Sequence, residues 1–338
     1  MRIAIVWNAQ AGSAAGVERQ TVEQQLAGAG AEVDVLDVCD ERSAAQCTRA
    51  ALERGADIVV AAGGDGTVSG VGAELVDTRA RLGVLPLGTS NSFAAALGIP
   101  AEIAGALALL ASAAGPAPAR PVDPAVPIDR HLDVAIVRGG AGETTMVMHC
   151  MVGFHADVIS ETSSDAKRRW GVLAYAASAV KQLASIATFA VELAADQHVV
   201  RCRATAVAVA NLAPIKTVLA HGPSHLLGDD GMVDVTIVAA ETMAEAIAAG
   251  IHLWRTARDG EPARRDSVGS LSSARVTITA DPPQHVLVDG EPFGETPVSI
   301  ETRPRALRVI APAPPHAEGP PAEASLIGLP DLEIETAR

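Results

Sequence analysis

The sequence predicts an α/β N-terminal domain built on a parallel sheet, followed by a β-rich C-terminal domain of the sandwich type. Three observations support this prediction. Apolar strand-like runs alternate with amphipathic helical segments up to Pro100, which is the pattern of a parallel sheet covered by helices. A Pro/Ala/Gly-rich stretch at Ala111–Pro121 then interrupts the chain. After it, short β-type runs outnumber helical ones, as in a sandwich.

Strands and helices are predicted to alternate in the N-terminal half. Val22 and Leu26 are spaced i, i+4 on one helix face, and Ser43 is a candidate N-cap with Gly55 closing the same helix. The βαβαβ order favours right-handed crossovers and a parallel sheet. The predicted strands are Ile3–Trp7, Ala31–Val38, Ile58–Ala62 and Gly83–Leu87, and the predicted helices are Val17–Ala27, Ser43–Arg54 and Ser92–Leu97.

The C-terminal half is predicted to be mostly β-structure. The predicted strands are Leu132–Arg138, Thr144–Met151, Ala190–Leu193, Val199–Ala210, Met232–Val238, Ala274–Thr279, His285–Val288 and Val298–Glu301. Two helices are predicted, Gly171–Ile186 and Ala244–Ala257. The expected domains are therefore 1–120 and 121–310, followed by a Pro/Ala-rich tail, 311–338, that is flexible or returns over the first domain.

Composition excludes several classes of protein. Hydrophobic residues make up 49% of the 338 residues, so the chain can bury large cores. The formal net charge of −14 argues against general attraction to nucleic acid or to an anionic membrane surface. No apolar stretch reaches the roughly 18 residues of a membrane span, and the N-terminus has no signal-peptide pattern. We therefore expect a cytoplasmic protein.

The four cysteines show no spacing typical of a zinc site or a disulfide framework. They are Cys39, Cys47, Cys150 and Cys202, and no pair forms a CxxC motif. The histidines likewise show no HExxH pattern. We expect reduced, partly buried thiols.

A glycine-rich turn follows the apolar run Ile58–Ala62. Gly63, Gly64 and Gly66 surround Asp65, and a helix is expected to begin there. Glycines permit positive φ and close approach of the backbone to a ligand, and N–H groups at a helix N-terminus attract anions. The turn therefore indicates a phosphate site. The alternative is an ordinary strand-to-helix turn with a surface aspartate.

Three loops are predicted to meet at one edge of the sheet. They are Asn8–Gly16, Gly63–Thr67 and Gly88–Asn91, each of which follows a predicted parallel strand. Ligands of open α/β sheets bind beyond the carboxyl ends of the strands. The loops therefore either converge on one phosphate-bearing ligand or lie on the same rim without a shared function.

An ordered set of motifs resembles the diacylglycerol kinase-like lipid kinases over roughly residues 1–310. Gly63–Thr67 reads GGDGT, which NAD kinases and phosphofructokinases share, so this motif alone is weakly specific. The order of the set is what makes the resemblance specific. Its members are Asn8–Gly12, Gly63–Thr67, Pro86–Phe93, Leu97–Pro100, Asp229–Asp234 and Asp289–Pro292.

The resemblance implies ATP and Mg²⁺ as cofactors and assigns roles to individual residues. Glu291 would be the general base, and Asp65 would hold the catalytic Mg²⁺ directly or through water. A structural Mg²⁺ would be held by Asp230 and by the carbonyl oxygens of Leu227 and Met232. The residues lining the ATP site would be Asn8, Gly63, Gly64, Asp65, Gly66, Thr67 and Thr89. Without the resemblance, Asp289-Gly290-Glu291 indicates a hairpin turn with an exposed acid.

Some positions depart from the family pattern. Ser92 stands where the family often has Asp, and Ala95 where it often has Arg, so one charge pair is missing. The first loop also has no basic residue between Asn8 and Gly16. These departures point to weaker catalysis more than to lost nucleotide binding.

Three functions follow from these patterns. The first is an ATP-dependent lipid kinase that phosphorylates a hydroxyl of diacylglycerol, a sphingoid base or a related amphiphile, with transient contact at a membrane surface. The second is a kinase of a soluble metabolite, similar to an NAD kinase. The third is a nucleotide-binding protein with weak catalysis. No nucleic-acid partner is expected, and the oligomeric state is left open, with a homodimer as one outcome.

Overall fold

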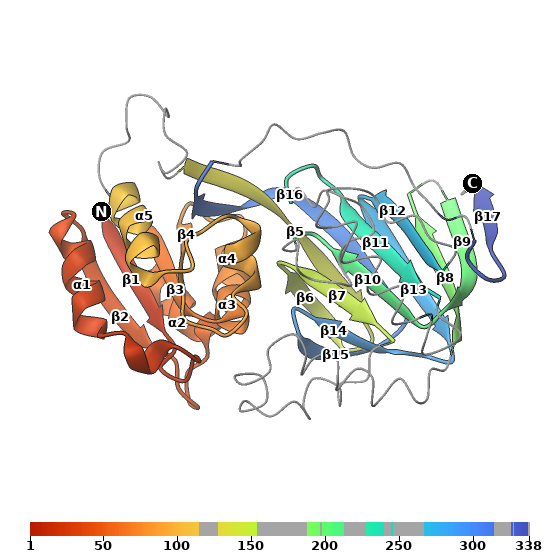
Figure 1. Cartoon of the computed structure of the whole chain (residues 1–338), viewed down its shortest axis with the longest axis horizontal. Coiled ribbons are helices and arrows are strands. Elements are labelled where there is room, and N and C mark those ends of the chain that lie inside the picture. Colours follow the sequence, from red (N-terminus) through yellow and green to blue (C-terminus); the bar gives the residue numbers. More distant parts are fainter. Residues whose placement is uncertain are drawn as a thin grey trace. The chain divides into compact units, whose positions relative to one another are not determined.

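The computed structural model describes residues 1–114, 128–153, 188–196, 198–212, 228–239, 245, 267–313, 326 and 328–336 (Figure 1). The chain divides into two units. Unit 1 comprises Met1–Val134 and Pro304–Glu318, and unit 2 comprises Ala135–Arg303 and Gly319–Arg338. The predicted helices Gly171–Ile186 and Ala244–Ala257 lie outside the described residues, apart from the helical residue Glu245.

Unit 1 contains a parallel sheet with the strand order β4-β3-β1-β2. The buried runs of the sequence form its centre, and every residue of β3 is buried. Its elements are β1 (Arg2–Trp7), η1 (Ala14–Gly16), α1 (Arg19–Gly28), β2 (Glu32–Asp37), α2 (Ala44–Glu53), β3 (Ile58–Gly63), α3 (Asp65–Leu75), β4 (Arg81–Pro86), α4 (Ser92–Ala96) and α5 (Ile103–Ala114). The α/β class of the N-terminal domain is confirmed.

The helices of unit 1 form two packed pairs. Helix α1 packs against α5, and α2 packs against α3 (Figure 1). The predicted N-cap of α2 is confirmed, because Ser43 and Gln46 form a reciprocal capping box. Helix α5 was not predicted. Only its last residues, from Ala111 on, fall in the predicted linker, and Leu107, Leu109 and Leu110 bury its apolar face.

Two long strands contribute residues to both units. Strand β5 (Ile128–Gly139) begins in unit 1, and strand β16 (Val298–Ala311) ends there, where Val309 pairs with Leu82 of β4 in parallel. The predicted boundaries at residues 120 and 310 therefore need correction. The buried C-terminal part of β16 extends the sheet of unit 1, so the first domain takes residues from far along the chain.

Unit 2 is β-rich and antiparallel. One sheet has six strands in the order β12-β11-β10-β7-β14-β15, and strands β8, β9, β13 and β16 pair in the other. A shared apolar core contains residues of both sheets, among them Val209, Val235 and Ile278. The remaining bounds are β6 (Gly142–Met146), β7 (His149–Val152), β8 (Phe189–Ala195), β9 (His198–Ala204), β10 (Ala206–Ala210), β11 (Val233–Val238), β12 (Val268–Ser273), β13 (Arg275–Asp281), β14 (His285–Val288), β15 (Glu291–Glu295) and β17 (Glu333–Thr336).

Several predicted strands differ from the observed ones. The predicted strand Thr144–Met151 is split into β6 and β7 by a bend at Val147 and Met148. The predicted strand Val199–Ala210 is split into β9 and β10. Strand β16 runs beyond Glu301, through Pro304 and Arg305, which has a left-handed φ of 54°. Strand β14 has the predicted bounds.

The C-terminal tail does not return to the first domain at its end. Strand β17 pairs with β9, and Arg201 of β9 forms an ion pair with Glu335. Leu329 is buried in the core of unit 2. The tail takes this course because its few leucines find an apolar surface in unit 2, and because β9 offers an unpaired edge.

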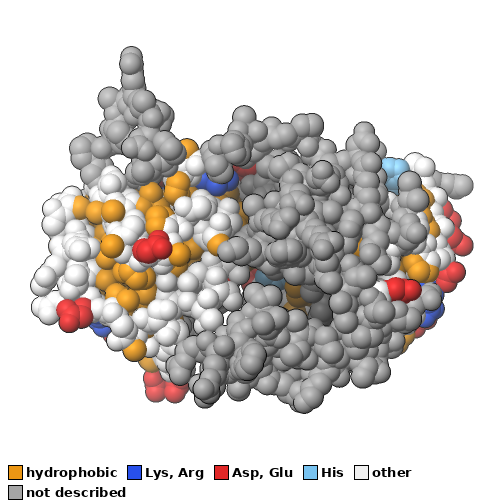
Figure 2. All heavy atoms as spheres, in the orientation of Figure 1, with side chains coloured by type: hydrophobic (Ala, Val, Ile, Leu, Met, Phe, Trp, Pro, Cys, Tyr) orange, Lys and Arg blue, Asp and Glu red, His pale blue; other side chains and the backbone are white. Residues whose placement is uncertain are grey.

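The cysteines are free thiols, as predicted. Cys39 is exposed, whereas Cys47, Cys150 and Cys202 are buried. Burial raises the pKa of Cys202 to about 11, so this thiol is unreactive. None of the described helices combines the length and the hydrophobicity needed to cross a bilayer. The face of unit 1 seen in Figure 2 shows isolated charged side chains and no broad basic area.

The packing of α5 on β4 predicts the effect of a mutation at Gly83. A Cβ at Gly83 would lie 2.6 Å from Cδ2 of Leu110 and 3.2 Å from Cγ2 of Val60. We expect Gly83→Ala to lower the free energy of unfolding by about 1–3 kcal/mol, measured by urea denaturation. Gly28→Ala is the matched control, because no heavy atom lies within 4 Å of its Cβ position. Equal stability of the two variants would contradict tight packing of α5.

Candidate functional site

The three predicted loops converge at the topological switch point of the unit 1 sheet. In the order β4-β3-β1-β2, strands β1 and β3 are neighbours. The chain continues from β1 to β2 on one side of this pair, and from β3 to β4 on the other side. Ligands of open α/β sheets bind at such a point, beyond the carboxyl ends of the strands. Two backbone hydrogen bonds join the loops, from Leu87 N to Gly63 O at 2.9 Å and from Ser13 N to Leu87 O at 2.8 Å.

Close backbone contact explains the glycines of these loops. A Cβ at Gly88 would lie 2.5 Å from Cα of Gly64, and one at Gly63 would lie 2.3 Å from Oγ1 of Thr67. Neither position has room for a side chain. Gly66, in contrast, is exposed and has no heavy atom within 4 Å of its Cβ position. Gly63 and Gly88 are therefore required by local packing, and Gly66 is not; a Cβ at Gly64 would lie 3.2 Å from Cα of Gly88, which is a tight contact.

Asn8 joins the first loop to the glycine-rich turn. Its backbone N donates to Ala62 O at 2.9 Å. Its side-chain Nδ2 donates to Oγ1 of Thr67 at 3.0 Å, and its Oδ1 accepts from Gln10 N at 3.0 Å. The predicted neighbours Asn8 and Thr67 are thus in direct contact, and both are at least partly buried.

Asn91 folds the third loop on itself. It has a left-handed φ of 48°, which Asn adopts more readily than most residues. Its Oδ1 accepts from Gly88 N at 2.8 Å, and its Nδ2 donates to Gly88 O at 2.9 Å. Thr89 is exposed in this loop, and a Cβ at Gly12 would lie 3.0 Å from its Oγ1. Thr89 therefore lies beside the first loop, and its role in an ATP site stays a prediction.

Asp65 has a structural contact that the sequence did not predict. Its Oδ1 accepts a hydrogen bond from Phe93 N at 3.0 Å, near the start of α4, and the side chain is half-buried. The contact is an N-capping interaction supplied from another element, and it ties the second loop to the third.

The site has hydrogen-bond donors for an anion but no cationic side chains. Helix α3 begins at Asp65, and its first-turn N–H groups carry the partial positive charge of a helix N-terminus. Neither Lys nor Arg occurs in residues 8–16, 63–67 or 86–91. Phosphate bound here would be held by backbone amides, by Asn and Thr side chains, and by any metal ion that accompanies it.

In unit 2, Glu291 opens strand β15 directly after a two-residue turn. Asp289 and Gly290 form the turn with φ values of 49° and 90°, as in a type I′ hairpin. Val288 pairs with Glu291, and the Glu291 side chain is exposed. The sequence predicted the turn. It did not predict that the Asp289 carboxylate accepts three hydrogen bonds, from the backbone nitrogens of Val147, Met148 and His149.

The predicted structural metal site is described only in part. Leu227 lies outside the described residues. Asp230 accepts a hydrogen bond from Met232 N at 2.9 Å, so one of its carboxylate oxygens closes a local turn. Among the described residues, no group of three or more His, Cys, Asp or Glu side chains is placed to hold a metal ion. The set of Asp230, Leu227 and Met232 stays a prediction.

Asp234, four residues further along, has an unusual environment. Its pKa is raised to about 7, mainly by burial; a hydrogen bond from Ser272 opposes the shift, and the negative charge of Asp230 adds to it. The carboxyl group is therefore partly protonated near neutral pH. This environment could not be predicted from the sequence, because the burial depends on strand pairing with β12.

Comparisons with known proteins agree with the architecture. A family model described as the diacylglycerol kinase catalytic domain matches residues 2–118. A second model, described as the YegS C-terminal NAD kinase beta sandwich-like domain, matches residues 149–311. Together the two matches include all three loops of unit 1 and the Asp289–Glu291 turn.

Relatives resemble the chain along most of its length. An uncharacterized protein of Synechocystis is 31% identical over 284 residues, which cover 83% of this chain and 61% of that protein. The chain thus spans less than two thirds of that relative. A protein of Stenotrophomonas maltophilia named probable lipid kinase YegS-like is 27% identical over 293 residues, covering 85% of this chain and 89% of that protein.

A crystal structure of a putative diacylglycerol kinase from Bacillus anthracis has the same fold. Its TM-score is 0.69, with 20% sequence identity, and the match covers 92% of this chain and 95% of that one. At this level of identity the likeness supports the fold alone.

The contact between Asp65 and Phe93 predicts different effects for two substitutions. Asp65→Ala removes the acceptor of the Phe93 N–H group and should lower the free energy of unfolding by about 0.5–2 kcal/mol. Asp65→Asn keeps a side-chain oxygen and should lose less than half as much. Urea denaturation of both variants without ligand measures the difference. Equal losses in the two variants would show that the capping contact contributes little to stability.

Proposed function

This chain belongs to the family of diacylglycerol kinase-like lipid kinases, and we propose that it transfers the terminal phosphoryl group of ATP to a hydroxyl group of an amphiphilic lipid. A diacylglycerol or a sphingoid base is the acceptor class. The observation that carries the proposal is the glycine-lined convergence of three loops at the switch point of unit 1. An amphiphilic acceptor would bring the protein into transient contact with a membrane surface from the aqueous side.

The residues of unit 1 fit an ATP phosphate chain. Gly63, Gly64 and Gly88 leave backbone where side chains would otherwise stand, and a phosphate can approach such backbone closely. The N-terminus of α3 supplies N–H donors. Thr89 adds an exposed hydroxyl group from the third loop. These groups would hold and orient the nucleotide without a Walker-type lysine.

Mg²⁺ bound with ATP would neutralise part of the negative charge of the phosphate groups. Asp65 is the one carboxylate in the three loops by sequence, so it is the residue proposed to hold this ion. Because its Oδ1 already accepts from Phe93 N, it would act through its other oxygen or through a water molecule. The same contact fixes the orientation of the carboxylate before any ligand binds.

Glu291 is proposed as the general base. Its carboxylate is exposed at the start of β15 and would accept the proton of the acceptor hydroxyl. Removal of that proton as phosphoryl transfer proceeds makes the oxygen a better nucleophile. The position of Glu291 beside a type I′ turn restricts its backbone, because two-residue turns of this type have little conformational freedom.

Two observations favour the two alternative functions, a kinase of a soluble metabolite and a nucleotide-binding protein with weak catalysis. The binding and transfer assays described below distinguish them from a lipid kinase. The C-terminal family model is described as NAD kinase beta sandwich-like, which favours a soluble nucleotide as acceptor. The absence of Lys and Arg from the three loops, with Ser92 and Ala95 at neighbouring positions, favours a nucleotide-binding protein with weak catalysis.

The glycine contacts predict how nucleotide binding responds to added methyl groups. Gly88→Ala forces a Cβ against Gly64 and against Oδ1 of Asn91, 2.8 Å away. If strain of about 1–3 kcal/mol opposes the binding-competent loop, ATP affinity falls between about 5- and about 150-fold. Gly66→Ala is the matched control in the same turn and should bind normally. Isothermal titration with Mg²⁺–ATP measures both. Equal affinities of the two variants would show that the contact between Gly64 and Gly88 is not needed for nucleotide binding.

Phosphate transfer itself is tested with radiolabelled ATP and a panel of acceptors. We expect label in diacylglycerol or a sphingoid base dispersed in detergent. Glu291→Gln and Asp65→Asn should each lower turnover about 100-fold or more. Glu291→Gln removes the proposed base, and Asp65→Asn removes the negative charge proposed to hold the metal ion.

The outcomes of this assay separate the three functions. Label in NAD instead of lipid would overturn the lipid proposal in favour of a soluble acceptor. Tight ATP binding with no transfer to any acceptor would support the weakly catalytic alternative. Full activity of Glu291→Gln would remove Glu291 from the role of base.

A further inference from the structure

We propose that Asp289 is a positioning residue for the phosphoryl transfer, and that it holds the turn carrying Glu291 by binding the backbone of a buried bend at Val147–His149. The inference rests on the proposed function, in which Glu291 is the general base. It adds a second residue of the same motif with a different task.

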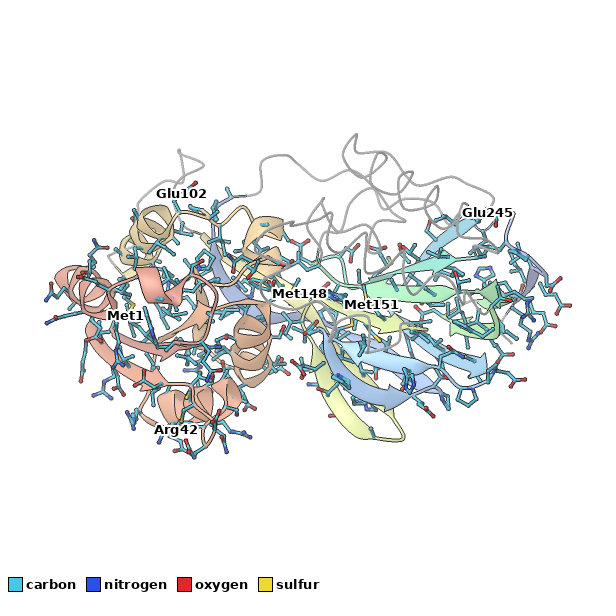
Figure 3. The ribbon with its side chains drawn as sticks, turned by 60° about the horizontal axis from the view of Figure 1, so that its bottom comes forward. Met1, Arg42, Glu102, Met148, Met151 and Glu245 are labelled. Carbon is cyan, nitrogen blue, oxygen red and sulfur yellow. The ribbon has the colours of Figure 1, made fainter. Side chains whose placement is uncertain are left out.

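The bend is buried, and regular strand pairing leaves its backbone N–H and C=O groups without hydrogen-bond partners. Val147 and Met148 interrupt the chain between β6 and β7, and each is only 2% exposed. Figure 3 labels Met148 and Met151, which mark the bend and the strand after it. Buried N–H and C=O groups need partners, since an unmet group costs about as much as a lost hydrogen bond.

Asp289 and Asn211 supply those partners. Oδ2 of Asp289 accepts from Val147 N at 2.8 Å, and its Oδ1 accepts from Met148 N and His149 N, both at 2.9 Å. The carbonyl oxygens of the same three residues also accept hydrogen bonds. Nδ2 of Asn211 donates to Val147 O at 3.0 Å, Asn211 N donates to Met148 O at 2.8 Å, and Asp289 N donates to His149 O at 2.8 Å.

All six backbone polar groups of the bend are therefore satisfied, four of them by Asp289. Three backbone N–H groups donate to this one carboxylate, and hydrogen bonds to a carboxylate are short and strong. Both carboxylate oxygens are engaged in these bonds. Asp289 is thus unsuited to take a proton from a substrate, whereas Glu291 is exposed and suited to that task.

Asp289, which is hydrogen-bonded to the bend, lies two residues before the proposed base, Glu291. Asp289 is the first residue of the two-residue turn, and Glu291 is the first residue after it. Val288, which pairs with Glu291, also pairs with Cys150 of β7. The Asp289 side chain and the strand pairing therefore fix the turn from two sides. Loss of one anchor would let the Glu291 carboxylate move, and a misplacement of about 1 Å can cost about 100-fold in rate.

Asp289→Asn tests this role with little change in size. Asn tolerates the left-handed φ of 49°, so the turn can still form. Its amide nitrogen cannot accept a hydrogen bond, so at least one N–H group of the bend loses its partner. We expect kcat to fall about 100-fold while KM for ATP changes by less than about twofold, because the nucleotide loops belong to unit 1.

A double mutant tests whether Asp289 acts through Glu291. If it does, adding Asp289→Asn to Glu291→Gln lowers kcat little beyond the loss caused by Glu291→Gln alone. Losses that multiply in full would overturn the inference. Asp331→Asn is the matched control, since Asp331 is an exposed aspartate of unit 2 with a left-handed φ of 53°. It should leave kcat unchanged.

Hydrogen exchange gives a readout without turnover. The amides of Val147, Met148 and His149 should be protected in the wild type and exchange faster in Asp289→Asn. Equal protection in both proteins would overturn the anchoring role. Should Asp289→Asn fail to fold, Asp289→Glu, which retains the charge but moves it by one methylene, should fold and show the same fall in kcat at an unchanged KM for ATP. Wild-type kcat in a folded Asp289 variant would overturn the inference.

The result also separates this inference from the proposed function. If the wild type transfers no phosphate to lipid, or if Glu291→Gln is fully active, the proposed function or its base fails and the positioning role falls with it. If Glu291→Gln is inactive and Asp289→Asn is fully active, only the inference fails.

Discussion

Backbone contact between Gly64 and Gly88 is the constraint on which the site of unit 1 depends. A Cβ at Gly88 would lie 2.5 Å from Cα of Gly64, so the second and third loops meet with no side chain between them. The hydrogen bond from Leu87 N to Gly63 O and that from Phe93 N to Asp65 both join the same two loops. The first loop joins through Asn8 and Thr67. The surface offered to a ligand is therefore largely backbone, and its donors are N–H groups.

This arrangement explains how an acidic chain can hold a phosphate chain. The net charge is −14, and the three loops contain neither Lys nor Arg. A helix N-terminus carries roughly half an elementary charge, which is less than one phosphate group brings. In the proposed function the balance would come from a metal ion, and the single loop carboxylate, Asp65, is the residue proposed to hold it. The proposed dependence on Mg²⁺ is therefore in keeping with both the composition and the geometry of the loops.

Much of the fold could be predicted from local pattern, because each predicted feature depended on residues close in sequence. The buried run Ile58–Ala62, the capping box at Ser43 and the strand His285–Val288 are of this kind. The convergence of the three loops followed from a general property of parallel sheets. What the sequence could not show depends on distant partners. The bend at Val147 lies inside an apolar run that favours a continuous strand, and it forms because Asp289, 142 residues later, binds its backbone. The capping contact of Asp65 likewise joins residues 28 apart.

The acidic residues of the motifs Gly63–Thr67 and Asp289–Pro292 have two kinds of role. Some bind backbone N–H groups and hold the chain in place, and others are proposed to take part in the reaction. Asp289 uses both carboxylate oxygens on backbone N–H groups, so it contributes geometry. Glu291, two residues away, is exposed and is the residue proposed to supply a basic oxygen. Asp65 does both, since one oxygen caps α4 and the other is available to a metal ion. A carboxylate that is already oriented by a backbone contact loses little conformational entropy when it binds a ligand. The same hydrogen bonds that stabilise the loops of each unit would therefore orient their acidic groups for the proposed reaction.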